Sequence, residues 1–307
     1  MPYNINVGFG REFANRLNLG LAGKTFVVGK DGLTNRQAYA EIFGVDPDGR
    51  VRFFSTVDAA IGETLANGGA TIYVLPGHTE TVTATSIALD VAGVNIIGLG
   101  NGLNRPTFTF GAAAATITVT GANCSWSNCH FIGNFLDVAA AFTIGVAKDF
   151  RLENNTFVDN TASLGFLSIV VTGSVDNDAD GLTVVNNFWY SLDVSPNAFV
   201  SILAAELRVL IADNNVDMAA TNDVGHFITL AAKIVRGIQI LRNRLIVVGS
   251  TGAVVGIFLT GSGTTSKGVV AYNLVSSLDT TTELIATAGL QNILKRIVRR
   301  VGEQMLK

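Results

Sequence analysis

One short run of acidic residues in this chain has metal-ligand spacing. Asp176, Asp178 and Asp180 alternate with other residues and precede Gly181, which matches the beginning of a D-x-D-x-D-G calcium loop. The twelfth position of such a loop requires a bidentate Glu, but here it is Asn187. Asp and Asn also crowd ordinary loops. We therefore predict no metal and no cofactor, and keep Asp176, Asp178 and Asp180 as the candidate ligands.

Carboxylates that could cleave a glycan are scattered. Polysaccharide-degrading enzymes need acidic residues gathered on one face. The acidic residues in the repetitive part of the chain share no common position: Asp137, Asp149, Glu153, Asp159, Asp193, Glu206, Asp213, Asp217 and Asp223. We interpret them as solvated charges at loops and edges, and we predict no catalytic residue and no enzymatic activity.

The three histidines, His78, His130 and His226, lie far apart and outside any Cys/His ligand spacing. No Ser or Cys nucleophile motif accompanies them. The chain has a net charge of −3 and no basic aromatic face, so nucleic-acid binding is not expected.

The elements that must position these residues are repeats. A six-residue phrase with apolar ends recurs, and its fourth position reads Cys129, Asn155, Asn187, Asn214, Asn243 and Asn273. The spacing between successive members of this column is typical of the repeats of stacked-coil proteins. Asn tolerates left-handed backbone angles, and its amide can bond to copies above and below, so the column predicts a ladder at a coil corner. The alternative is separate turns between antiparallel strands.

A second column of short apolar runs, rich in β-branched residues, lies about 25 residues upstream of each Asn. The runs are 117–119, 142–144, 169–171, 202–204, 228–230 and 257–259. Each coil then holds two strands and a variable third segment. Together the columns predict an all-β fold, a right-handed parallel β-helix over residues 51–289.

A capping helix is expected at 55–66, with Ser55 as its N-cap and Asn67-Gly68-Gly69 as its stop. A strand ending in Pro76-Gly77 follows. This order resembles the opening of pectin-lyase-like β-helix proteins, in which the helix covers the open end of the coil.

The two ends differ from the middle. Residues 1–50 lack the repeated phrase, although Lys24–Gly29 could form a strand, and we interpret them as an arm or as a cap. Residues 290–307 are basic, and their apolar residues share one helical stripe, which predicts an amphipathic C-terminal helix. That helix could cap the solenoid or join subunits, lie on an anionic membrane, or be foreign to the solenoid.

Composition bears on partners. Hydrophobic residues make up 48% of the chain and charged residues 15%, more apolar surface than a narrow solenoid can hide. We therefore expect a homotrimer with apolar outer faces between subunits. No membrane span is expected, and a disulfide between Cys124 and Cys129 is improbable from their spacing.

The phrases from Val51 to about Thr118 resemble β-helical structural proteins of tailed bacteriophages. They include 52–61, 71–81, 87–94 and 98–102. The resemblance implies a virion component that decorates or cements the capsid. Because the sequence shows neither a signal-peptide pattern nor a membrane span, we expect synthesis in the host cytoplasm. We expect the 1–50 arm to hold the major capsid protein. The alternative is a tailspike-like receptor-binding or polysaccharide-degrading protein.

Overall fold

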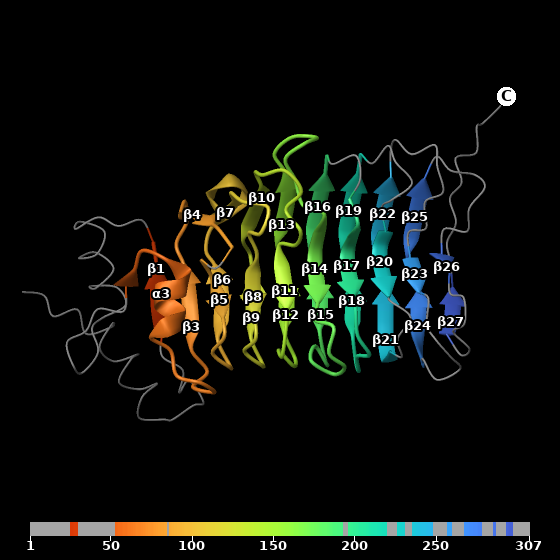
Figure 1. The fold of residues 1–307 in the computed structure, drawn as a ribbon, viewed down its shortest axis with the longest axis horizontal. Helices are drawn as coiled ribbons and strands as arrows, with labels where there is room; N and C mark the ends of the chain where they lie inside the picture. The colour runs from red at the N-terminus through yellow and green to blue at the C-terminus, as the bar shows by residue number, and fades with distance from the viewer. Residues whose placement is uncertain are drawn as a thin grey trace, which may run out of the picture.

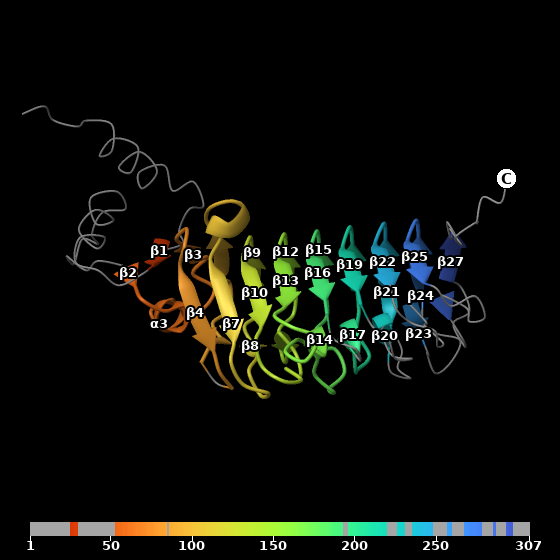
Figure 2. The same ribbon diagram turned by 90° about the horizontal axis from the view of Figure 1, so that it is seen from above.

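The computed structural model is a parallel β-solenoid (Figures 1 and 2). It describes residues 25–29, 53–84, 86–192, 196–219, 226–230, 235–247, 257–259, 267–277, 285–286 and 293–296. Three sheets of 11, 8 and 8 strands run along the solenoid, here called sheets A, B and C. From β3 (Thr71–Val74) to β26 (Ile285–Ala286), each turn contributes one strand to each sheet, and neighbouring strands within a sheet are parallel.

The strands are short, and their order in each sheet follows the turns. Sheet A holds β2 (Phe53–Phe54), β1 (Thr25–Val28), β3 (Thr71–Val74), β6 (Asn95–Gly98), β9 (Ser125–Ser127), β12 (Arg151–Glu153), β15 (Thr183–Val185), β18 (Leu210–Ala212), β21 (Arg236–Leu241), β24 (Lys267–Ala271) and β27 (Ile293–Arg296). Sheet B holds β4 (Thr79–Val82), β7 (Thr107–Phe110), β10 (His130–Gly133), β13 (Thr156–Asp159), β16 (Phe188–Ser191), β19 (Asn215–Met218), β22 (Arg244–Val247) and β25 (Leu274–Ser277). Sheet C holds β5 (Ala88–Leu89), β8 (Ile117–Val119), β11 (Phe142–Ile144), β14 (Ser168–Thr172), β17 (Ala198–Ile202), β20 (His226–Leu230), β23 (Ile257–Leu259) and β26 (Ile285–Ala286).

Alternation along each strand sends apolar side chains into one continuous core. In sheet B the register stacks Phe108, Phe131, Phe157 and Trp189 in successive turns. The Phe131 and Phe157 rings lie 4.8 Å apart and nearly parallel, at 12°. Because identical positions repeat at the strand spacing, large rings can fill a narrow interior by stacking.

The predicted fold is confirmed at the level of a parallel solenoid. The apolar runs predicted as the second column lie in sheet C, except that 202–204 overlaps its strand β17 only at Ile202. Each turn has a third strand where a variable segment was expected. The repeated phrase is the corner between sheets A and B: Trp126 and Ser127 end β9, and His130 and Phe131 begin β10.

The described residues contain a single α-helix, α3, at Val57–Gly62, together with a 3-10 turn, η1, at Gly102–Asn104. The helix is shorter than the predicted 55–66, and its N-cap is Thr56 instead of Ser55. The Thr56 side chain accepts a hydrogen bond from the Ala59 N–H at 3.3 Å. Asp58 Oδ1 accepts from the Ala88 N–H at 3.0 Å, which ties the helix to sheet C.

The predicted C-terminal helix over 290–307 is wrong where the structure describes it. Ile293–Arg296 form strand β27, which pairs in parallel with β24 of sheet A. Without β27, the outer edge of β24 in sheet A would have no partner strand. Pairing with that edge outweighs the helical pattern of the local sequence. The other residues of that segment lie outside the described ranges.

The first strand also revises the N-terminal boundary. β1 lies within the segment interpreted as an arm, at the place where a strand was expected around Lys24–Gly29. It pairs with both β2 and β3, so it is part of sheet A. The solenoid therefore includes residues before 51, and the rest of 1–50 lies outside the described residues.

Candidate functional site

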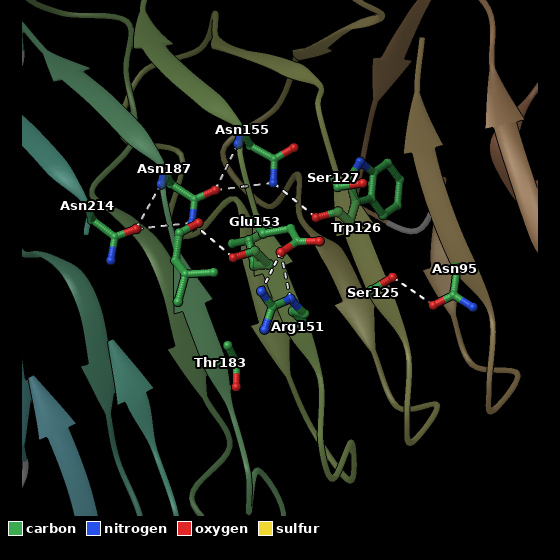
Figure 3. A network of polar contacts seen from close by, with 12 residues as sticks. Asn95, Ser125, Trp126, Ser127, Arg151, Glu153, Asn155, Thr183, Asn187 and Asn214 are labelled. Carbon is green, nitrogen blue, oxygen red and sulfur yellow. Dashed lines mark hydrogen bonds and ion pairs between the residues drawn. The ribbon is translucent and has the colours of Figure 1, made fainter. Parts of the chain in front are cut away.

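The predicted asparagine column forms a continuous buried ladder, of which Figure 3 shows Asn155, Asn187 and Asn214. Asn187 donates from its backbone N–H and from Nδ2 to Oδ1 of Asn214, at 2.9 and 3.1 Å. The Asn214 Nδ2 donates in turn to the Val184 carbonyl at 2.9 Å. The same pattern joins Asn155 to Asn187, Asn214 to Asn243 and Asn243 to Asn273. Each amide thus links adjacent turns through groups that are hidden from water.

Cys129 is the first residue of this column and the one member that is not Asn. Its backbone N–H donates to Asn155 Oδ1 at 2.9 Å, so a first position needs no amide of its own. Cys124 and Cys129 are free and buried. Burial raises the pKa of the Cys129 thiol to about 12, so this sulfur is an inert core group.

The left-handed backbone angle falls on the residue before the ladder, which corrects the sequence argument. The residues with positive φ at this corner are Asn128, Asn154, Asn186, Asp213, Arg242 and Tyr272. Asn and Asp suit that conformation, whereas Arg and Tyr adopt it at a cost. Arg242 is held by Asp213 of the preceding turn, with Nη2 and Oδ2 2.6 Å apart, and this pair lowers the pKa of Asp213.

The three candidate metal ligands do not converge on a cation. Asp176 Oδ1 accepts from the Ala205 N–H at 3.0 Å, and Asp180 Oδ1 from the Leu207 N–H at 2.7 Å. These bonds tie the loop between β14 and β15 to the next turn. No three His, Cys, Asp or Glu side chains in the described ranges are grouped so that they could hold a metal ion.

Glu206 lies beside this loop and contradicts its interpretation as a solvated charge. Its side chain is fully buried, and Oε2 accepts from the Ala179 N–H at 3.1 Å while Oε1 has no partner in the described part of the chain. Burial, with Asp180 and Asp178 nearby, raises the pKa of Glu206 to about 8. A neutral carboxylic acid is the form that this position accepts at neutral pH.

The histidines are separate from one another. His78 is buried and its Nε2 lies 3.1 Å from Glu80 Oε2, which also accepts from the Val57 N–H of α3. His130 is half-buried on the outer face of sheet B, where burial and then Arg105 lower its pKa. The side chain of His226 lies outside the described residues. His78 and Glu80 therefore form a buried contact that joins the first turn to α3.

The outer face of sheet B gathers side chains that can contact a ligand. On β16, Phe188 and Tyr190 flank the buried Trp189, and Tyr190 is 43% exposed. On the next turns, Arg244 Nη1 donates to Asn215 Oδ1 at 2.7 Å and Asp217 Oδ1 at 3.0 Å. This group was not expected from the sequence, although Phe188 and Trp189 end the repeated phrase and Tyr190 follows directly. Alternation along the strand places Phe188 and Tyr190 on one face.

Several other charged groups are paired. Arg151 and Glu153 form an ion pair at 2.6 Å on sheet A (Figure 3), and Arg208 lies 3.4 Å from Asp149. Asp159 is buried, with Oδ1 accepting from the Phe166 N–H and Oδ2 from Ser191 Oγ. Asp149 and Asp159 link neighbouring turns, whereas Glu153 pairs within its own strand. None of the three forms an open pair with another carboxylate of the kind that glycan cleavage uses.

The comparisons with known proteins give a fold-level likeness. No protein-family model and no curated protein matches the chain. Among solved structures, a chain described as a rhamnogalacturonan lyase aligns over 88% of this chain and 87% of its own length, with a TM-score of 0.36 and 13% sequence identity. At these values the likeness carries no argument about activity. No helix among the described residues has the length and apolar character to cross a membrane.

Proposed function

We propose that this chain is a non-enzymatic structural protein of a bacteriophage virion, a trimer that decorates and cements the capsid. The observation that carries the structural role is the buried asparagine ladder, which joins successive turns from Asn155 to Asn273. A rod whose polar groups are used to hold its own turns together is suited to bearing load. The virion assignment rests on the sequence resemblance described above.

Exposed apolar side chains support the trimer. In three successive turns, the loop after the sheet C strand presents a large apolar residue: Val146 at 60%, Val175 at 62% and Leu203 at 40% exposure. Isolated exposed apolar residues are ordinary, but a recurring stripe along a rigid rod suits contact with another subunit. In a trimer these side chains would lose much of their contact with water.

The test is association with assembled shells. Purified protein should co-sediment with capsids that lack it, and particle images should place it on the shell. Native mass measurement at micromolar concentration should give three chains. Localisation at the tail, or a stable soluble monomer with no affinity for shells, would overturn this proposal.

Polysaccharide degradation is the alternative function, and the described carboxylates do not favour it. Asp217, which lies next to the exposed Tyr190 in the register of sheet B, is paired with Arg244. Incubation with host surface polysaccharide should release no new reducing ends and no unsaturated sugars. Robust turnover would move the protein to the tailspike class.

A further inference from the structure

A strip across the outer face of sheet B combines the exposed ring of Tyr190 and the half-buried ring of Phe188 with fixed guanidinium groups. Its members are Arg105, Thr156, Phe188, Tyr190, Asn215, Asp217 and Arg244, here called the sheet B strip. Phe188 lies between Thr156 and Asn215 of the adjoining turns, and Tyr190 is next to Asp217. The aromatic side chains stand on the solvent face of a strand whose inner residue, Trp189, is fully buried. They therefore leave apolar ring surface available to a ligand.

One side of the strip is organised by Arg244. Both of its bonds, to Asn215 and Asp217, come from Nη1. In the described part of the chain, Nε and Nη2 have no protein partner. The side chains of Arg244 and Asp217 are 42% and 30% exposed. The guanidinium is thus held in place while part of its donor fork still faces solvent, which suits a carboxylate ligand.

The other side is organised by Arg105, which reaches the strip from the loop before β7. Its Nη2 donates to Thr156 Oγ1 at 2.7 Å, and its Nε to the Gly102 carbonyl at 3.3 Å. His130 occupies the position next to Thr156 in the register. Because burial and Arg105 lower its pKa, His130 adds a neutral hydrogen-bonding ring at neutral pH instead of a third charge.

These features together point to a carbohydrate with acid groups. Ring faces bind the C–H faces of sugars, amide and hydroxyl groups bind sugar hydroxyls, and guanidinium groups bind carboxylates. Neighbouring strands lie about 4.8 Å apart, so the strands from β13 to β22 span the length of a short oligosaccharide. We propose that the sheet B strip binds a uronate-bearing glycan without cleaving it. This goes beyond the structural role and does not depend on capsid attachment.

Two other ligand classes fit less well. An extended peptide usually adds to a free sheet edge, whereas the strands of the strip are paired on both sides. A nucleic acid needs several unneutralised cations, and this chain has a net charge of −3, with Asp217 beside Arg244. The strip's modest positive charge and its aromatic rings suit a sparsely charged sugar chain.

The experiment titrates the full chain with an alginate hexasaccharide and with the same sugar after carboxyl reduction. We expect saturable calorimetric binding of the acidic form and at least about tenfold weaker binding of the reduced form. Tyr190→Ala and Arg244→Ala should each weaken binding by about tenfold or more. The matched controls are Tyr272→Ala, an exposed tyrosine at a corner, and Arg151→Ala, an ion-paired arginine on sheet A.

Each possible binding result either supports the proposal or overturns it. Loss of binding in the two strip variants with both controls unchanged supports the proposal, and a wild-type circular dichroism spectrum establishes that those variants are folded. The proposal is overturned if the acidic sugar does not bind, if the reduced sugar binds equally well, or if strip and control variants bind alike. It is also overturned if the strip variants lose trimer formation instead of sugar binding, because the strip would then be a subunit contact.

Discussion

At the residue scale, the ladder derives its strength from amides that donate and accept at once. Asn214 accepts from Asn187 with Oδ1 and donates to the Val184 carbonyl and to Asn243 with Nδ2. Removing it leaves the backbone N–H of Asn187, in the preceding turn, without its partner in a place without water. A missing partner at such a site costs more than a hydrogen bond contributes on average, because the remaining groups stay desolvated.

Asn214→Ala should therefore lower the free energy of unfolding by about 1–3 kcal/mol. Chemical denaturation followed by circular dichroism measures the change. Asn160→Ala is the control, since Asn160 is exposed and bonds only to Asn134 Oδ1 with its side chain. If the two variants have equal free energies of unfolding, the asparagine ladder does not contribute to stability as described.

Glu206 makes a second residue-scale prediction, about pH. Its pKa is about 8 in the folded chain against an ordinary value of 4.5, so the folded state holds a proton that the unfolded chain releases between these values. The contribution of this group to stability is therefore complete at low pH and falls as the pH rises through about 8. Glu206→Gln should remove this fall and melt at a higher temperature than the wild type in alkaline buffer.

Thermal melts across this pH range measure the effect, with Glu153→Gln as the control. Glu153 is a partly exposed carboxylate paired with Arg151, and its substitution should leave the pH dependence unchanged. A Glu206→Gln variant that follows the wild-type pH curve would mean that the carboxyl group does not titrate as described.

At the element scale, the repeated patterns and β1 were predicted from the sequence, the bounds of α3 were approximate, and the C-terminal helix was wrong. The Asn column and the sheet C runs recur in many turns, so small irregularities in any one turn do not hide them. The C-terminal stripe from Leu290 to Met305 is also periodic, yet Ile293–Arg296 add a strand to sheet A. A local periodic pattern carries no information about the open edge of sheet A with which this segment pairs. The sheet B strip was missed for the same reason, since Arg105 and Thr156 are 51 residues apart and meet only through the stacking of turns.

Helix α3 gives the element-scale prediction. Thr56 accepts from the Ala59 N–H, whereas Ser55, the N-cap expected from sequence, is exposed. Thr56→Ala should lower the melting temperature, with a loss of about 0.5–2 kcal/mol in unfolding free energy. Ser55→Ala should change neither. If the two substitutions have equal effects, the cap is not set by the Thr56 side chain.

At the scale of the whole molecule, the solenoid is a rod with a distinct chemistry on each side. Sheet B carries the aromatic and cationic strip, and the loops after sheet C carry the apolar stripe of Val146, Val175 and Leu203. A trimer formed through the stripe could leave the strip facing solvent. This arrangement would allow a decoration protein to hold its own subunits together and still contact a glycan.

Attachment to the shell is the last prediction, and β1 decides how it is tested. A chain beginning at Val51 would lack β1, which lies between β2 and β3 in sheet A, so loss of capsid binding could reflect damage to the first turn. A chain beginning at Lys24 keeps that strand and removes the preceding residues.

If these residues are the arm that holds the major capsid protein, this variant should keep the wild-type β spectrum and the trimer but fail to co-sediment with shells. A variant lacking residues 297–307, with β27 retained, is the matched control and should bind normally. Wild-type occupancy of shells by the chain beginning at Lys24 would assign the contact to the solenoid or to the basic C-terminal segment.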